Sequence, residues 1–252
     1  MASQEIILSK EKNIAFLTLN RPERKNAFNV PLAKELNRAL QEMDKDPDIR
    51  VVVIRGSGKD FCVGIDLKEF ENRSRGDYDE FIRLMDRHNH TIAEMKKPVI
   101  ASVRGYAVAN GTGLAAACDL TLASETARFG TTAINVGLIC LGPAAPIQAS
   151  IGRKRTLELL LTGRIIDAHE AERLGLVNRV LPDADLDGET RKLAEQLASK
   201  SPLALEAGKT GLYRCEDLPY KESLELRSGL FAALCGTEEA KEGVKAFLLQ
   251  HP

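Results

Sequence analysis

The chain has 252 residues and a formal net charge of −1, with 44% hydrophobic and 28% charged residues. A chain of this length can bury a sizeable core, as one large domain or one domain with an appendage, and its composition is typical of a soluble globular protein. The net charge gives no reason to expect nucleic acid or an anionic membrane as a partner, and no apolar run reaches the roughly 20 residues that a membrane span needs.

Apolar periodicity predicts alternating strands and helices over the first 182 residues. The predicted strands cover residues 6–8, 14–19, 51–55, 99–103, 120–124 and 177–181, with a hairpin turn between the first two. The predicted helices cover residues 30–44, 77–95, 152–161 and 168–174, with a further helix of small residues that ends at Cys118. Residues 70–76 are charged and are predicted to form a mobile loop.

After Pro182 the strand pattern stops, and helices are predicted over residues 189–199, 203–213 and 218–249. This order indicates an α/β core, residues 1–182, and a helical C-terminal segment, residues 183–252, within the same structural unit. The last predicted helix carries an apolar stripe that exceeds what the surface of a monomer should expose. The stripe consists of Leu224, Leu226, Leu230, Phe231 and Leu234.

The cysteines are odd in number and have no metal-ligand spacing; they are Cys62, Cys118, Cys140, Cys215 and Cys235. We interpret them as free thiols, mostly buried, in a reducing compartment, and expect no metal site. The N-terminal residues have neither a basic region nor a long apolar run, so we expect no signal peptide and a cytoplasmic location.

Two short stretches rich in small residues each follow a predicted strand and lead into a helix-compatible segment. The first is Asp60-Phe61-Cys62-Val63-Gly64-Ile65-Asp66-Leu67, and the second covers residues 105–113. A turn before a helix N-terminus leaves backbone N–H groups free and directed at one spot. Two such turns could together bind the oxyanion that develops on a thioester carbonyl, where each donor must lie about 3 Å from the oxygen.

Together with motifs along most of its length, these stretches make the chain resemble the crotonase family, also called the enoyl-CoA hydratase/isomerase superfamily. The resemblance starts near Ile14 and runs to the C-terminus. Its motifs are Leu19-Asn20-Arg21-Pro22, Asn26-Ala27-Phe28-Asn29, residues 61–67, Lys97-Pro98-Val99-Ile100-Ala101, Cys118-Asp119-Leu120, Leu161-Thr162-Gly163, Ala168-His169-Glu170-Ala171 and Gly175-Leu176-Val177-Asn178. Their order along the chain makes the resemblance specific.

The resemblance implies an α/β crotonase (ClpP-like) spiral of ββα units, with a helical C-terminal segment that makes trimer contacts. It implies an acyl-CoA thioester as the bound partner, no cofactor beyond the coenzyme A of the substrate, and a homotrimer or a dimer of trimers. The expected activity belongs to the acyl-CoA lyase and isomerase class, nominally enoyl-CoA hydratase.

The resemblance also implies the parts played by individual residues. The backbone N–H groups of Ile65 and Asn110 form the oxyanion hole; Asn110 replaces the usual glycine, and asparagine tolerates an unusual backbone angle better than most residues. The expected coenzyme A contacts are Arg24, Lys25, Ala27, Val63, Asp66 and Leu67. The expected contacts nearer the acyl group are Gly111, Ala133, Cys140 and Leu141.

The chain departs from the hydratases at the two glutamates that handle water. The first lies three residues past the oxyanion-hole glycine, where this chain has Gly113. The second follows the Phe-Gly pair by three residues, where this chain has Ala133. The usual two-glutamate hydration is therefore not expected, and the region around Cys140 most resembles a branch of hydratase-domain-containing proteins that also lack both glutamates.

Other candidate groups have structural and chemical interpretations. His88 and His90 precede Lys97-Pro98; His90 is a tentative acid–base group by analogy with the dehalogenase branch, and a surface or core position is the alternative for both. Cys140 has no basic neighbour in sequence and is interpreted as a small apolar wall residue. Asp119 is interpreted as a structural cap or a buried hydrogen-bonding group.

Two functions stay open at this point. One is an enzyme acting on a CoA thioester as an isomerase, decarboxylase, thioesterase or hydratase with relocated acid–base groups. The other is an acyl-CoA-binding pseudoenzyme or regulator without turnover. A carboxylate or histidine near the α or β carbon of the substrate would favour the enzyme, and a purely apolar pocket would favour the binder.

Overall fold

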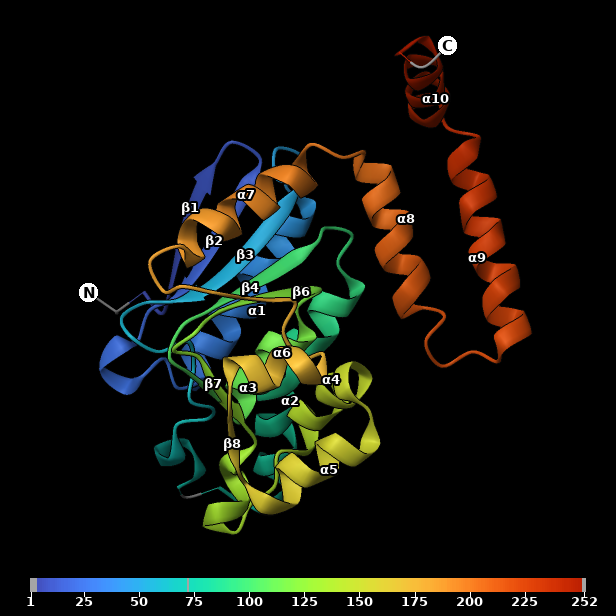
Figure 1. The fold of residues 1–252 in the computed structure, drawn as a ribbon. Helices are drawn as coiled ribbons and strands as arrows, with labels where there is room; N and C mark the ends of the chain where they lie inside the picture. The colour runs from blue at the N-terminus through green and yellow to red at the C-terminus, as the bar shows by residue number, and fades with distance from the viewer. Residues whose placement is uncertain (1–3, 72, 251–252) are drawn as a thin grey trace.

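The computed structural model describes residues 4–71 and 73–250. Its main sheet has six strands in the order β1-β2-β3-β4-β6-β9 (Figure 1). β1 (Ile6–Glu11) and β2 (Ile14–Leu19) form the predicted antiparallel hairpin. The other neighbouring pairs are parallel and involve β3 (Val51–Gly56), β4 (Val99–Val103), β6 (Leu120–Ser124) and β9 (Arg179–Leu181).

The central strands are buried on both faces, which explains why they read as continuous apolar runs. In β3, Val52 and Ile54 join one buried cluster with helices α1 (Val30–Lys45), α2 (Arg75–Glu94) and α3 (Asn110–Ala117). Val51 and Val53 face the other way and join a second cluster with α7 (Leu186–Ala198). Thus α7, which belongs to the predicted C-terminal segment, covers one face of the sheet of the core.

A smaller sheet, in the order β5-β7-β8, lies beside the first. β5 (Tyr106–Val108) pairs in parallel with β7 (Arg128–Gly130), which pairs in antiparallel fashion with β8 (Ile165–Asp167). The sequence pattern does not predict these strands, because three residues are too few to show an alternation. The remaining short elements are the single turns of 3₁₀ helix η1 (Pro22–Arg24), η2 (Leu67–Phe70) and η3 (Thr132–Val136) and the helices α5 (Arg153–Thr162) and α6 (Ala168–Leu174).

Helix α4 (Leu141–Ile151) is an element that the sequence pattern does not predict. The helix is difficult to predict from the sequence because it contains two prolines, which usually indicate the end of a helix. Pro143 stands in the first turn, where its missing N–H would have no helical partner in any case, and Pro146 lies inside the helix. The N-terminal turn of α4 packs against α3, and this contact shapes the site described below.

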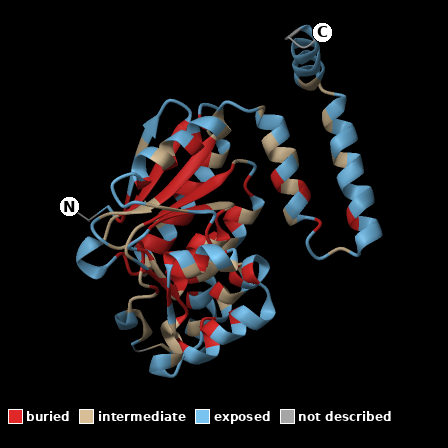
Figure 2. Cartoon of the chain, viewed as in Figure 1, coloured by how far each residue is buried: buried red, intermediate tan, exposed pale blue. Residues whose placement is uncertain are grey.

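The tail forms three helices that extend away from the sheet (Figure 1): α8 (Pro202–Tyr213), α9 (Tyr220–Cys235) and α10 (Glu238–Gln250). The prediction of one helix over residues 218–249 is wrong, since the chain breaks at Gly236. Of the predicted apolar stripe, Leu224, Leu226 and Phe231 are exposed. Figure 2 shows that α9 and α10 are exposed along nearly their whole length.

Asp119 ties α8 to the sheet. Its Oδ2 atom accepts a hydrogen bond from the Val99 N–H at 2.7 Å and another from Lys209 Nζ at 2.8 Å. Lys209, on α8, is 8% exposed and also donates from Nζ to the Lys97 carbonyl at 3.0 Å. The interpretation of Asp119 as a buried hydrogen-bonding group is confirmed.

We predict that Asp119→Ala destabilises the fold by about 3–5 kcal/mol, because it leaves the buried Lys209 ammonium without its anion. Urea unfolding followed by circular dichroism measures this, since the chain has no tryptophan to report by fluorescence. Asp79→Ala is the matched control, because Asp79 makes an exposed ion pair with Arg83. Equal unfolding midpoints for the two variants would contradict the prediction.

Candidate active site

The two predicted turns lie against each other. Cys62 forms an isolated parallel bridge with Ala107 of β5. The Cys62 N–H donates to the Tyr106 carbonyl at 3.0 Å, and the Val108 N–H donates to the Cys62 carbonyl at 2.9 Å. Gly111 is buried against the same Cys62 carbonyl, with which a Cβ at position 111 would collide. The first stretch therefore extends the small sheet alongside β5.

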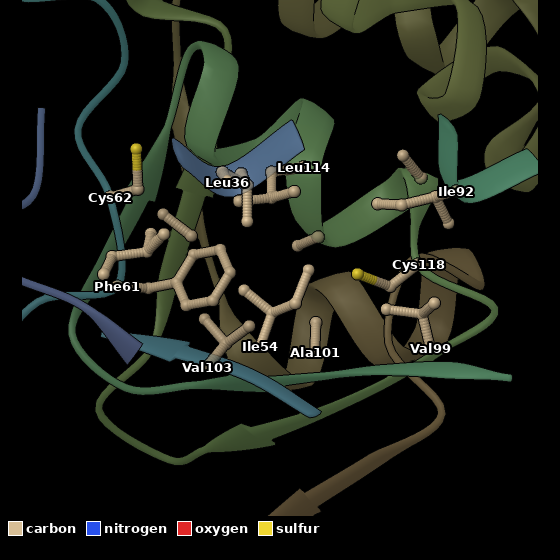
Figure 3. Close-up of a cluster of buried hydrophobic side chains, with 14 of the residues drawn as sticks. Leu36, Ile54, Phe61, Cys62, Ile92, Val99, Ala101, Val103, Leu114 and Cys118 are labelled. Carbon is tan, nitrogen blue, oxygen red and sulfur yellow. The ribbon is translucent and has the colours of Figure 1, made fainter. Parts of the chain in front are cut away.

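Phe61 anchors the first turn in the hydrophobic core. Its side chain points into the same buried cluster as Ile54, Val103 and Leu114 (Figure 3). Phe61 is 1% exposed, and Leu114 belongs to α3, the helix that follows the second turn. The hydrophobic core thus fixes both turns through side chains that precede or follow them directly.

Ile65 has a free backbone donor. On either side of it, the Phe28 N–H donates to the Gly64 carbonyl at 2.7 Å and the Asp66 N–H donates to the Phe28 carbonyl at 2.8 Å. In extended chain, successive residues direct their backbone groups to opposite sides, so the Ile65 N–H points away from Phe28. It makes no backbone hydrogen bond with any residue that the structure describes.

Asn110 supplies the second predicted donor. It is the first residue of α3, and the first N–H groups of a helix have no partner inside it. Gly64 lets the two turns approach closely: a Cβ at position 64 would lie 2.7 Å from Ala109 Cβ and 3.5 Å from Asn110 N. The two N–H groups predicted for the oxyanion hole therefore stand on neighbouring, tightly packed turns.

The unusual backbone angle of the second turn falls on Ala109, with φ 51° and ψ −119°. Asn110 itself is helical, so its position does not need the tolerance of asparagine for an unusual backbone angle. A residue other than glycine at positive φ costs of order 1–3 kcal/mol, and such strain concentrates at functional sites.

The residues predicted to contact coenzyme A gather beside the first turn. The bridge between Phe28 and Ile65 brings residues 24–28 next to residues 63–66. Arg24 and Lys25 are both exposed, and Lys25 Nζ lies 5.3 Å from the centre of the Tyr106 ring. Ala27 is buried.

On the other side of this bridge, Val63 is half-buried and Leu67 is 58% exposed. Asp66 has structural partners: its Oδ2 lies 3.3 Å from Arg21 Nη2, and its Oδ1 accepts from the Lys68 N–H at 3.3 Å. Contact of these residues with coenzyme A stays a prediction. Because the Asp66 carboxylate already has these partners, we expect Asp66 to contact the ligand through its backbone.

The two positions that the resemblance predicts to match the family's glutamates, Gly113 and Ala133, carry no acid–base group. Gly113 faces α4, where a Cβ would lie 2.7 Å from Pro143 Cβ and 2.9 Å from Pro143 Cα. Ala133 lies in η3, and its backbone hydrogen-bonds the Cys140 thiol. Burial raises the pKa of Cys140, which agrees with its interpretation as an unreactive wall residue. Leu141, next along the chain, is 69% exposed.

Asp86 is the group that the sequence analysis missed. It lies on α2, half-buried, and its Oδ1 accepts a hydrogen bond from Asn110 Nδ2 at 3.0 Å. Burial raises the pKa of Asp86 to about 6, against smaller lowering effects of the Asn110 amide and of His90. No sequence motif marks this residue, because its partners come from distant parts of the chain.

The two histidines of α2 differ in their surroundings. His88 is 2% exposed and stacks on Phe28, with ring centroids 5.3 Å apart. Burial lowers the pKa of His88 to about 4, so it is a neutral core residue at physiological pH. His90 is exposed one helical turn after Asp86. Its acid–base role stays a prediction.

Among the described residues, no group of three or more His, Cys, Asp or Glu side chains could hold a metal ion. Within the same ranges, none of the helices is long and apolar enough to cross a membrane.

Comparison with known proteins defines the class. The Enoyl-CoA hydratase/isomerase family profile matches residues 9–251. The chain belongs to this family, and its fold is the crotonase fold. A protein of Mycobacterium bovis named a probable enoyl-CoA hydratase is 35% identical over 251 residues, which cover 98% of this chain and 96% of the relative.

Two solved structures agree closely with the fold. The crystal structure of an enoyl-CoA hydratase of Mycobacterium smegmatis superposes with a TM-score of 0.95 at 35% identity, over 98% of this chain and 97% of that one. Human enoyl-CoA hydratase domain-containing protein 3 also gives a TM-score of 0.95, at 30% identity, over 99% of each chain. The chain is thus similar both to a named hydratase and to a hydratase-domain-containing protein.

We predict that Asp86→Asn stabilises the fold by about 1–2 kcal/mol near neutral pH. The folded-state pKa of about 6 lies above the ordinary value of 3.8. At a pH between these two values, the folded state keeps a proton on Asp86 that the unfolded state has lost. This bound proton stabilises the folded wild-type protein, and its contribution is lost as the pH rises through about 6. Asparagine has no such dependence, so the gain should vanish near pH 4.

Urea unfolding across this pH range, with circular dichroism as the signal, measures the effect. Asp79→Asn serves as the control, since it removes an exposed carboxylate from the same helix. An Asp86→Asn protein that is less stable than wild type at every pH would contradict the prediction.

Proposed function

We propose that this protein is an enzyme that acts on a CoA thioester and holds the thioester oxygen between the N–H groups of Ile65 and Asn110. The observation that supports the proposal is the close approach of Gly64 to Ala109 and Asn110, which brings together the two turns that carry these N–H groups. The relatives' names, which refer to enoyl-CoA hydratases, support the same ligand class.

In this proposal the pantetheine arm runs between the two turns. The exposed cations Arg24 and Lys25 lie at the edge of the first turn, where they can meet phosphate groups. Val63, Asp66 and Leu67 offer backbone contacts to the adenine, and Cys140, Leu141 and Ala133 border the acyl group.

The proposed chemistry is not the two-glutamate addition of water. Gly113 and Ala133 stand where the resemblance places the glutamates, and Pro143 fills the space beside Gly113. A glutamate at position 113 would therefore not fit without displacement of α4. We place the protein with the branch that lacks both glutamates, in the lyase and isomerase class.

The alternative is an acyl-CoA-binding pseudoenzyme or regulator, which the lack of both glutamates favours. Asp86 favours the enzyme, because a titratable carboxylate is hydrogen-bonded to the side chain of an oxyanion-hole residue. Incubation with saturated, unsaturated and malonyl-type CoA thioesters, followed by mass spectrometry, separates the two. Binding without any product would favour the regulator.

We predict that acyl-CoA binding weakens about 3- to 10-fold, and becomes less dependent on salt, when Arg24 and Lys25 are both replaced by alanine. Isothermal titration calorimetry with hexanoyl-CoA at two salt concentrations measures both effects. The matched control is Lys34→Ala with Arg38→Ala, which removes two exposed cations from α1. Folded wild-type protein that binds no acyl-CoA would overturn the proposed function.

We also propose a homotrimer or a dimer of trimers, built with the helical tail. The exposed apolar residues of α9 and α10 support this, among them Phe231, Val244 and Leu248, at 67%, 61% and 61% exposure.

Light scattering at micromolar concentration should give at least three times the monomer mass of 27.6 kDa. Phe231→Asp should lower that mass, because it would place a charge between subunits. A monomer mass for the wild-type protein would contradict this assembly.

A further inference from the structure

We propose that Asp86 is the acid–base residue of this site, and that it moves a proton along the acyl chain of a β,γ-unsaturated CoA thioester. This inference rests on the proposed function, because it takes the thioester oxygen to lie between the Ile65 and Asn110 N–H groups.

Asn110 links the two parts of the proposed machinery. Its backbone N–H is the oxyanion-hole donor, and its side-chain Nδ2 holds Asp86 Oδ1 at 3.0 Å. The carboxylate therefore lies one asparagine side chain away from the donor. The α carbon of a thioester is bonded directly to the carbonyl carbon, so an oxygen held at the donor brings the α hydrogens towards the carboxylate. A base must come within about 3 Å of the atom that it deprotonates.

Gly142 makes room for this carboxylate. A Cβ at position 142 would collide with both Asp86 oxygens and with Asp86 Cγ. Gly142 lies in the first turn of α4, directly after the predicted acyl contacts Cys140 and Leu141. Asp86 thus lies where the N-terminal ends of α3 and α4 meet, on the acyl side of the oxyanion hole.

Asp86 has no structural partner that would account for a charged group at this place. Among the described residues it has one hydrogen bond, from a neutral amide, and no salt bridge. Asp119 shows the contrast, since its buried carboxylate is neutralised by Lys209. A partly buried carboxylate without a cation costs stability, and such groups concentrate at functional sites.

The electrostatics suit a base that works near neutral pH. A pKa of about 6 leaves Asp86 ionised at pH 7 while making it a stronger base than an ordinary aspartate. The titratable groups that act on it are His90, on its own helix, and the Cys140 thiol at the start of α4. α3 contributes the neutral Asn110 amide.

The proposed step conserves every atom. Asp86 takes a proton from the α carbon, and the C–H electrons move towards the thioester oxygen, where the Ile65 and Asn110 N–H groups stabilise the dienolate. Asp86 then returns the proton to the γ carbon, and the double bond shifts from the β,γ to the α,β position. One carboxylate suffices for this exchange, and it needs neither water nor a co-reactant.

The test uses the full-length protein with trans-3-hexenoyl-CoA in D₂O. Wild-type protein should form 2-hexenoyl-CoA, as followed by NMR and mass spectrometry, and any deuterium in the product measures how often the proton on Asp86 exchanges with solvent before its return. Asp86→Asn should lower this rate by about 10²–10⁴-fold. Its Kd for hexanoyl-CoA should stay within about threefold of wild type, since the oxyanion hole is intact. Circular dichroism and light scattering verify that the variant folds and assembles.

Two further variants test position separately from charge. Gly142→Ala keeps the carboxylate but displaces it, so it should also slow the reaction. Asp79→Asn removes an exposed carboxylate from the same helix and should leave the rate unchanged. The wild-type kcat/KM should fall as the pH drops through about 6, and the residual activity of Asp86→Asn should lack that step.

Three results would overturn the inference. The first is an Asp86→Asn rate within about threefold of wild type. The second is wild-type protein that binds hexanoyl-CoA but neither isomerises 3-hexenoyl-CoA nor exchanges its α hydrogens; the proposed function would then stand without this inference. The third is hydration of 2-hexenoyl-CoA faster than isomerisation, which would overturn the assigned reaction. Absence of all acyl-CoA binding would overturn both proposals together.

Discussion

The close contact between two turns is the constraint on which the rest of the site depends. Gly64 has no side chain, so the chain before η2 approaches Ala109 and Asn110 within van der Waals distance. The hydrophobic core holds this contact through Phe61 on one side and Leu114 on the other. The core therefore fixes the two turns that carry the backbone N–H groups proposed for the oxyanion hole.

The two carboxylates near α3 illustrate how their surroundings decide the role of a charged group. Asp119, at the C-terminal end, is paired with Lys209 and joins α8 to the sheet. Asp86, at the N-terminal end, accepts one hydrogen bond from the described residues, that of the Asn110 amide, and has a raised pKa. The ion pair of Asp119 with Lys209 stabilises the fold. The Asp86 carboxylate, in contrast, is left as a proton acceptor next to the proposed oxyanion hole.

The start of α4 borders both Gly113, one of the positions predicted to match a family glutamate, and Asp86, the proposed acid–base residue. Pro143 occupies the space beside Gly113, so a carboxylate cannot approach from α3. Gly142, one residue earlier, leaves room for the carboxylate of Asp86 from α2. A shift of the acid–base group from one helix to another is compatible with the shared fold, because a fold positions backbone donors more strictly than it determines side-chain identity.

The sequence by itself determined the sheet, most helices and the two turns. Strands buried on both faces leave continuous apolar runs, and the hairpin and the amphipathic α1 and α2 follow from local periodicity. Small-residue stretches between regular elements are local signals for such turns, and the resemblance to the family then predicts Ile65 and Asn110 as the backbone donors. Tertiary structure alone decided α4, the strain at Ala109 and the importance of Asp86. Asp86 has the sequence pattern of an ordinary charged helix residue. The fold buries it, which raises its pKa, and brings Asn110 and Gly142 from distant parts of the chain into contact with its carboxylate.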